Sequence, residues 1–141
     1  MPLVVRQRRR KRGGAVAVEF AMTAPILFLF VFAIFEFGRA FMVIDLLGDA
    51  ARVGCREGAI QGKSTSSIKA DVQSRLQGEG INGVTVDGVV VTVNGVVADT
   101  STAQSGDTIN VAVSIPASSV TWTNTNFISG NLSGQSSLAK E

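Results

Sequence analysis

The sequence has no histidine and a single cysteine, Cys55. One cysteine excludes an intramolecular disulfide, so the folded part must be held together by packing. Because histidine is absent and the acidic residues do not cluster, no transition-metal site is indicated and we expect no cofactor. There is also no nucleophile beside a base and no pair of neighbouring carboxylates, so we expect a non-catalytic protein. We interpret Cys55 as a small buried residue on a helix, with an intermolecular disulfide or a reactive thiol as the alternative.

Acidic residues are absent before Glu19, whereas six of the thirteen basic residues lie within the first twelve positions. These six are Arg6, Arg8, Arg9, Arg10, Lys11 and Arg12. Without them the chain has seven basic and eleven acidic residues, a net charge of −4. The sequence pI of about 9.1 therefore describes a short tail and not a basic domain, and we expect no nucleic-acid partner.

Hydrophobic residues make up 45% of the chain and are concentrated near its N-terminus. The sixteen residues Phe20–Phe35 carry no charge, and extending this segment back to Gly13 adds only Glu19 as a charged residue. A helix that rises 1.5 Å per residue needs about 20 such residues to cross a bilayer. No clear small-x-small cleavage site follows the segment, which favours a retained membrane helix over a removed signal peptide.

The basic residues that flank this helix predict its orientation. They all precede it, so the positive-inside rule places the N-terminus in the cytoplasm and the chain beyond Arg39 outside. The residues that we expect to set this orientation are Arg8, Arg9, Arg10, Lys11 and Arg12. The sequence therefore predicts a single-pass protein of the inner (cytoplasmic) membrane, in contact with lipid.

The helical pattern continues beyond the apolar segment to about Gly58. Small and apolar residues recur there at steps of four and three, which predicts a buried stripe. The stripe contains Phe37, Phe41, Ile44, Gly48, Ala51 and Cys55, with Ala40, Leu47, Gly54 and Gly58 beside it. Opposite lie Asp45, Asp49, Arg52 and Arg56, which we interpret as a solvated face. Because small residues let another backbone approach closely, we expect a sheet to pack on the stripe.

The remaining sequence predicts a short helix followed by strands. The helix has Ile68, Val72 and Leu76 on one face, with Ser66 or Ser67 as its cap. Two turn signals then predict an antiparallel meander, and a strand that ends at Pro116 and weaker strands follow it. The predicted strands are Val84–Val86, Val89–Val93, Val96-Val97, Ile109–Ile115 with Ile109, Val111, Val113 and Ile115 facing inward, Val120 with Trp122, and Leu132–Leu138. We expect an α+β fold in which one long N-terminal helix packs against a small antiparallel sheet, as in pilins.

Glu19 and Pro25 are unusual residues for the interior of an apolar helix. A carboxylate there is unfavourable without a partner, and intramembrane acids are functional candidates for that reason. The simpler explanation for Glu19 is its place in the first turns, where the helix dipole favours an anion by about 0.3–1 kcal/mol and headgroups or arginines are within reach. Pro25 removes a helical hydrogen bond, which predicts a kink, and an assembly role is a further hypothesis.

Residues 8–20, RRRKRGGAVAVEF, resemble the cleavage region of type IV prepilins. In that family a basic leader ending in Gly is removed on the cytoplasmic side, and Glu is the fifth residue of the mature chain. The resemblance implies that Gly14 is the last leader residue, Ala15 the first mature residue and Glu19 the fifth. It also implies that Glu19, together with Phe20 and Pro25, contributes to contacts between subunits, in which Glu19 attracts the N-terminal ammonium of a neighbour.

Further groups of residues match a more specific pattern: Gly14–Phe20, Ala24-Pro25, Glu36–Arg39 and Ala50–Arg52. With them the chain resembles the TadE-like family, pseudopilins of the tight adherence (Tad/Flp) pilus system. The C-terminus has fewer basic and methionine residues than this resemblance leads us to expect. The resemblance implies processing by an aspartic prepilin peptidase, contacts with other pseudopilins and the Tad secretion platform, and a role in pilus assembly and adhesion.

The predicted domain organisation is a basic cytoplasmic leader over residues 1–14, a transmembrane helix over 15–36, its amphipathic continuation over 37–62 and an extracytoplasmic α+β domain over 63–141. Two alternatives stay open at this level. One is an uncleaved, signal-anchored envelope protein whose outer domain binds a ligand or another protein. The other is an exported soluble protein from which residues 1–35 are removed.

Overall fold

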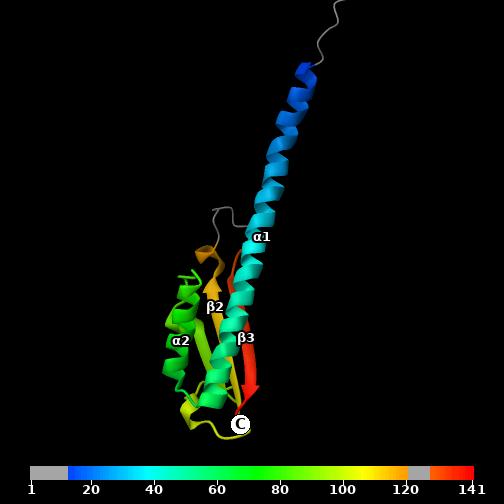
Figure 1. Cartoon of the computed structure of the whole chain (residues 1–141). Helices are drawn as coiled ribbons and strands as arrows, with labels where there is room; N and C mark the ends of the chain where they lie inside the picture. The colour runs from blue at the N-terminus through cyan, green and yellow to red at the C-terminus, as the bar shows by residue number, and fades with distance from the viewer. Residues whose placement is uncertain (1–12, 121–127) are drawn as a thin grey trace, which may run out of the picture. The chain divides into compact units, whose positions relative to one another are not determined.

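The structure, a computed structural model, describes residues 13–120 and 128–141. The chain divides into two compact units, Met1–Ile34 and Phe35–Glu141, and the first helix runs from one into the other. The basic residues Arg8–Arg12 and the predicted strand residue Trp122 lie outside the described residues. Figure 1 shows the elements. In order they are α1 (Gly13–Gln61), α2 (Thr65–Gly78), η1 (Val86–Gly88), β1 (Val89–Val93), η2 (Thr100–Thr102), β2 (Thr108–Pro116), η3 (Ala117–Ser119) and β3 (Asn131–Ala139).

The second unit contains an antiparallel sheet in the order β1-β2-β3, which confirms the predicted α+β class. The C-terminal part of α1 and helix α2 cover one face of this sheet (Figure 1). Strands turn alternate residues to opposite faces, so each strand contributes every second side chain to the core. The inward residues predicted for β2 are confirmed as buried: Ile109, Val111, Val113 and Ile115.

The buried face of α1 in this unit is rotated from the predicted stripe. Phe41 is 64% exposed and Phe37 is also exposed, so the interpretation of both as core residues was wrong. Most of the other residues predicted for the stripe or beside it are buried, and these mainly small residues let α2 and the sheet approach the helix closely. The small and apolar residues of α1 that are buried here are Ala40, Val43, Leu47, Ala50, Ala51, Gly54, Cys55, Gly58 and Ala59. The charged residues predicted to face solvent are exposed, but apolar residues flank the stripe on both sides, so their spacing alone left the exact rotation of the helix open.

Helix α1 and the sheet approach each other closely at a pair of glycines, Gly48 and Gly134. A Cβ atom at Gly134 would overlap the backbone of Leu47 and Gly48. On the side of α1 that faces α2, a Cβ at Gly54 would lie 3.0 Å from a methyl group of Val72. The predicted close approach of a sheet to small residues on α1 is therefore confirmed, and Gly134 is the residue on the sheet that permits it.

Helix α2 confirms the prediction of a short amphipathic helix, because Ile68, Val72 and Leu76 are buried. Its cap is Ser64 and not Ser66 or Ser67. The Ser64 hydroxyl accepts a hydrogen bond from the backbone N–H of Ser67 at 3.4 Å, which satisfies one of the free N–H groups at the helix start.

Of the predicted meander, the strand Val89–Val93 is confirmed as β1, whereas the strands predicted at Val84–Val86 and Val96-Val97 were wrong. Val86–Gly88 forms a 3-10 turn in which the Thr85 hydroxyl accepts a hydrogen bond from the N–H of Gly88. Asn94 and Gly95 both have positive φ, as expected for an Asn-Gly turn, but beyond them only Val96 forms a bridge with Val93. Asn94 bonds to Thr108 of β2, which pairs with β1 along the edge opposite the Val96 bridge.

The strand predicted at Leu132–Leu138 is confirmed as β3, which pairs with β2 along nine residues. Val120 is buried but follows the 3-10 turn η3 and lies in no described strand.

Candidate processing and assembly site

Gly14 and Ala15, the predicted cleavage site, lie in the first turn of α1 and are exposed. The first four N–H groups of a helix have no intrahelical acceptor, so this turn opens at less cost than the helix interior. A Cβ at Gly14 would meet nothing within 4 Å. The peptide bond between these residues is therefore sterically open in the described part of the chain.

Glu19 lies one turn beyond Ala15 and is exposed. Its backbone carbonyl accepts a hydrogen bond from the Thr23 hydroxyl at 2.9 Å. No cation among residues 13–120 and 128–141 forms an ion pair with its carboxylate. Phe20 is exposed beside it, and Pro25 lies within the uninterrupted helix. The structure thus places the predicted assembly residues on the surface of one helix segment.

The first unit exposes apolar side chains on every side of α1. They include Val16, Val18, Phe20, Met22, Ile26, Leu27, Phe28, Leu29, Phe30, Phe32 and Ile34. A helix with exposed apolar side chains all round is typical of a membrane span and not of a soluble surface helix. Within the described residues α1 is the one helix that is long and apolar enough to cross a membrane.

The model of the family described as TadE-like protein matches residues 14–56. This segment of the chain is TadE-like. The match begins at the predicted cleavage site, and it includes both the apolar part of α1 and the part that packs on the sheet. It confirms the resemblance inferred from the sequence over these residues. No curated protein and no solved structure gives a significant match to the chain.

Two charged residues of the TadE-like segment received no role from the sequence, although they lie three residues apart just after the apolar run. Glu36 is only 7% exposed, and Arg39 is half-buried. The Arg39 Nε atom donates a hydrogen bond to the carbonyl oxygen of Val120 at 2.7 Å. Arg39 therefore holds the chain that follows β2 against α1. Two opposite charges three residues apart, directly after an apolar run, were the feature of the sequence that could have indicated this role.

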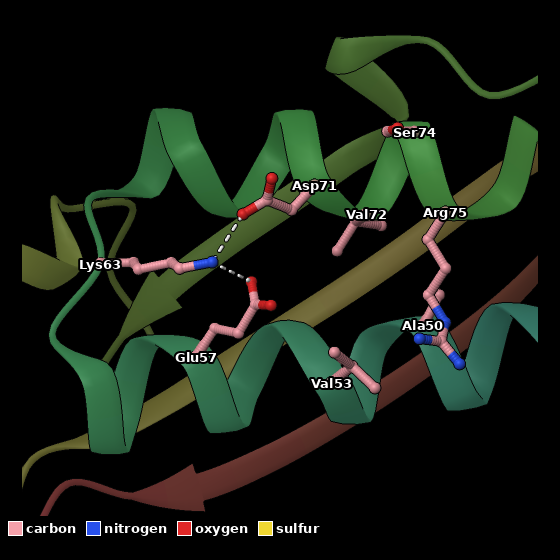
Figure 2. Close-up of a pocket in the computed structure, with 8 residues that line it drawn as sticks. All are labelled: Ala50, Val53, Glu57, Lys63, Asp71, Val72, Ser74 and Arg75. Carbon is pink, nitrogen blue, oxygen red and sulfur yellow. Dashed lines mark hydrogen bonds and ion pairs between the residues drawn. The ribbon is translucent and has the colours of Figure 1, made fainter. Parts of the chain in front are cut away.

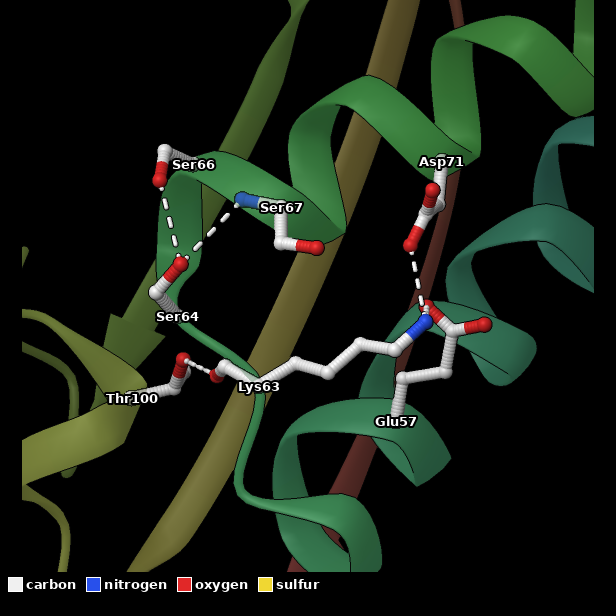
Figure 3. Close-up of polar contacts among 7 residues, drawn as sticks. All are labelled: Glu57, Lys63, Ser64, Ser66, Ser67, Asp71 and Thr100. Carbon is white, nitrogen blue, oxygen red and sulfur yellow. Dashed lines mark hydrogen bonds and ion pairs between the residues drawn. The ribbon is translucent and has the colours of Figure 1, made fainter.

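A polar cluster joins the end of α1 to α2 and lines a pocket of about 360 Å³ (Figure 2). The Lys63 ammonium lies 2.8 Å from Asp71 Oδ2 and 3.4 Å from Glu57 Oε2. The Lys63 carbonyl accepts a hydrogen bond from the Thr100 hydroxyl, and the next residue, Ser64, caps α2 (Figure 3). The turn between the two helices is thus held by the side chain of Lys63 and by its backbone carbonyl.

The electrostatics of this cluster indicate a structural role. Hydrogen bonding to the Lys63 ammonium lowers the pKa of Asp71, and the same contact raises the pKa of Lys63. Both groups are therefore charged at neutral pH, so neither is poised to exchange a proton. The cluster ties the turn between α1 and α2.

Cys55 is buried within the TadE-like segment, as predicted, with 1% of its surface exposed. Its thiol lies 2.9 Å from the carbonyl oxygen of Ser136 on β3 and donates to it. Burial raises the pKa of this thiol, which keeps it protonated at neutral pH. Cys55 therefore acts as a packing residue between α1 and the sheet.

Proposed function

We propose that this protein is a pseudopilin of a Tad/Flp pilus, inserted in the inner membrane by α1 and processed between Gly14 and Ala15 by a prepilin peptidase. Its role is non-catalytic and consists of contacts with other pseudopilins and with the Tad secretion platform during pilus assembly and adhesion. The observation that carries the proposal is the TadE-like match over residues 14–56.

The geometry of the N-terminal segment supports the processing step. Cleavage after Gly14 removes the charged residues that precede it and leaves Ala15 as a new N-terminal ammonium. The segment that would remain in the membrane then carries Glu19 as its first charged side chain. A peptidase acting at the membrane surface needs only the first, weakly held turn of the helix to open.

The exposure of Glu19 supports an assembly role. A carboxylate that faces lipid is unfavourable by several kcal/mol unless it finds a cation. The ammonium of Ala15 on a neighbouring subunit is such a cation, and it exists only after cleavage. The attraction between the two charges in an apolar environment then favours one register between neighbouring helices.

The proposed orientation rests on the charge asymmetry around α1. The basic leader precedes the apolar segment, so residues 1–13 are cytoplasmic and the unit that begins near Phe35 is extracytoplasmic. The sheet and α2 then lie outside the membrane, where α1 presents its buried face to them.

N-terminal mass spectrometry of the protein expressed with its cognate peptidase tests the processing step. We expect a mature chain that starts at Ala15, and we expect the intact chain in the Gly14→Ala variant. The structure offers a matched control, because Gly38→Ala changes another α1 glycine with nothing within 4 Å and leaves the cleavage site alone. An intact N-terminus in the wild type would favour the uncleaved signal anchor, and a start beyond Phe35 would favour an exported soluble protein.

Pilus counts in a strain that carries Glu19 variants test the assembly step separately. We expect Glu19→Gln to be cleaved normally but to lose assembly, because the amide has the same size and no charge. Glu19→Asp keeps the charge and should retain part of the function. Normal piliation in the Glu19→Gln strain would contradict the proposed charge pairing while leaving the processing step intact.

A further inference from the structure

Strand β3 forms one edge of the sheet, because the order is β1-β2-β3. Its outward backbone groups can be identified from the bonds at its two ends. Beyond the two ends of β3, Lys140 N–H donates to the carbonyl of Asp107, and Ala117 N–H donates to the carbonyl of Gly130. Bonding alternates along an antiparallel pair, so every second residue of β3, counted from Gly130 to Lys140, bonds to β2. The alternate residues therefore point their N–H and C=O groups away from the sheet: Ser133, Gln135 and Ser137, with Asn131 and Ala139 at the ends.

These outward groups are free of hydrogen bonds within residues 13–120 and 128–141. Natural edge strands are usually protected by proline, by charged residues or by a bulge. The β3 sequence NLSGQSSLA contains no proline and no charge, and its pairing with β2 has no bulge. This edge is suited to accept another strand.

A groove of about 610 Å³ runs beside this edge, between α1 and β3. Its apolar part is formed by the exposed side chains of Ile60 and Leu138. Its polar part includes Arg52 and Arg56. Arg52 pairs with Asp49, whereas Arg56 forms no ion pair with any residue that the structure describes. The groove is thus apolar at one end and positively charged along its side.

The opposite edge of the sheet carries a segment with complementary properties. Val96 and Val97 are the exposed residues after the Asn94-Gly95 turn, and Val97 is 74% exposed. Val96 exchanges both backbone hydrogen bonds with Val93, so the backbone of Val97 points outward, and no described residue bonds to it. The loop over residues 94–107 also contains two aspartates, Asp99 and Asp107, and no basic residue.

The two edges match in level and in direction. Val96, Val93, Ile109 and Leu138 lie in one row across the sheet, so the valine segment is level with the apolar end of the groove. The chain at Val96 runs antiparallel to β1. Strand β1 runs parallel to β3, because both are antiparallel to β2. A second copy placed beside the first in the same orientation would therefore present its valine segment antiparallel to β3.

We propose that the outer units of two copies of this chain join head to tail, with the segment Val96–Ala98 of one copy adding to the open edge of β3 in the next. Val96 then packs beside Leu138 and Ile60, and Val97 exchanges backbone bonds with Ser137. The loop that carries Val96 and Val97 contains Asp99 and Asp107 and no basic residue, so its charge is opposite to that of the basic side of the groove. Because the two surfaces differ, the contact is heterologous and can extend into a row of copies that share one orientation.

This contact lies wholly within the second unit and does not require cleavage after Gly14. Its failure is therefore distinguishable from failure of the proposed function. Processing is read from the N-terminal mass, whereas the contact is read from cross-linking of the outer unit.

Disulfide cross-linking of the full chain in lipid nanodiscs or detergent tests the contact. In a Cys55→Ala background, we expect the double variant Val96→Cys with Leu138→Cys to form a ladder of dimers, trimers and larger species on mild oxidation. Each single variant alone should stay monomeric, and a mixture of the two single variants should stop at dimers. The double variant Val90→Cys with Leu138→Cys is the matched control, because Val90 is exposed on the sheet face and outside the contact.

A proline scan of the edge provides a second measurement. Ser137→Pro removes the outward N–H that would bond to Val97, and we expect the yield of the ladder to fall roughly fivefold. Ser133→Pro removes an outward N–H farther along the same strand and should leave the yield unchanged. Dimers of Leu138→Cys alone would indicate a symmetric contact between two β3 edges and would overturn the proposal. The proposal would also be overturned if the Val90 control cross-linked as well as the Val96→Cys with Leu138→Cys variant, or if that variant stayed monomeric.

Discussion

Gly134 shows how one missing side chain determines where α1 sits on the sheet. Its Cα hydrogen faces the backbone of Leu47 and Gly48, and no other residue type leaves room for this approach. The sequence contains many glycines in polar segments, and nothing local distinguishes Gly134 from them. Its role follows only from the contact with α1.

Gly134→Ala should destabilise the outer unit by about 1–3 kcal/mol, because the added methyl group forces α1 and β3 apart. Urea unfolding of the full chain in detergent, followed by circular dichroism, measures this change. Gly48→Ala is the matched control on the other side of the contact. A Cβ there meets nothing within 4 Å, and alanine favours the helix by about 0.5–1 kcal/mol. Equal stability of the two variants would contradict the close approach at Gly134.

Cys55 should be unreactive in the native protein, because its thiol is buried, hydrogen-bonded to Ser136 and has a raised pKa. We expect maleimide labelling at neutral pH to be slow in the folded chain and complete within minutes in denaturant. Mass spectrometry after timed quenching provides the readout. Fast labelling of the folded chain would show that the α1 and β3 contact opens readily.

At the scale of elements, α2 follows the pattern of an amphipathic helix closely. Its three apolar residues recur at steps of four, and all are buried. By contrast, the valine-rich region was read as three strands because valine and turn dipeptides are typical of hairpins. Side-chain bonds of Thr85 and Asn94 decided otherwise, and such bonds are not visible in a propensity pattern.

Leu76→Ala in α2 should lower the free energy of unfolding of the outer unit by about 2–5 kcal/mol, since the side chain is completely buried. Chemical unfolding monitored by circular dichroism or pulse proteolysis measures the loss. Gln77→Ala, one residue away and exposed, should change stability by less than about 0.5 kcal/mol. A small effect of Leu76→Ala would mean that α2 contributes little to the core.

At the scale of the whole molecule, three aspartates of the second unit link its stability to pH. Hydrogen bonding to Lys63 lowers the pKa of Asp71. The N–H of Ser101 lowers the pKa of Asp99, and the N–H of Gln104 lowers the pKa of Asp107. Between the folded pKa and the usual value of 3.8, the unfolded chain binds more protons than the native chain. These carboxylates therefore stabilise the fold above that value, and the contribution is lost as the pH falls below it.

We expect the midpoint of urea unfolding to stay constant from about pH 7 to pH 5 and to decrease below about pH 4. The Asp107→Asn variant should be less stable at neutral pH and should show a weaker decrease in acid, because one of the three groups no longer titrates. If the unfolding midpoint of the variant decreased with pH as steeply as that of the wild type, Asp107 would be excluded as a contributor to the pH dependence of stability.

The sequence by itself determined the elements whose signal is local. An apolar run long enough to span a bilayer, the charges before it, and the TadE-like motifs from Gly14 to Arg52 lie within one continuous segment. Alternation of apolar residues was likewise sufficient for β2 and α2, because each buries one side of a regular element. The candidate site residues Gly14, Ala15, Glu19, Phe20 and Pro25 were chosen from the sequence, and their roles stay predictions.

Only the tertiary structure decided the exact rotation of α1 against the sheet. The charged residues of α1 exclude one side of the helix, but the apolar residues on the remaining surface allow several rotations. The contact between Gly48 and Gly134 selected the face that carries the smallest residues, and the large rings of Phe37 and Phe41 were left exposed. The row that joins Val96 to Leu138 also exists only in the folded sheet, because strand register depends on pairing between distant segments and not on neighbours in the chain.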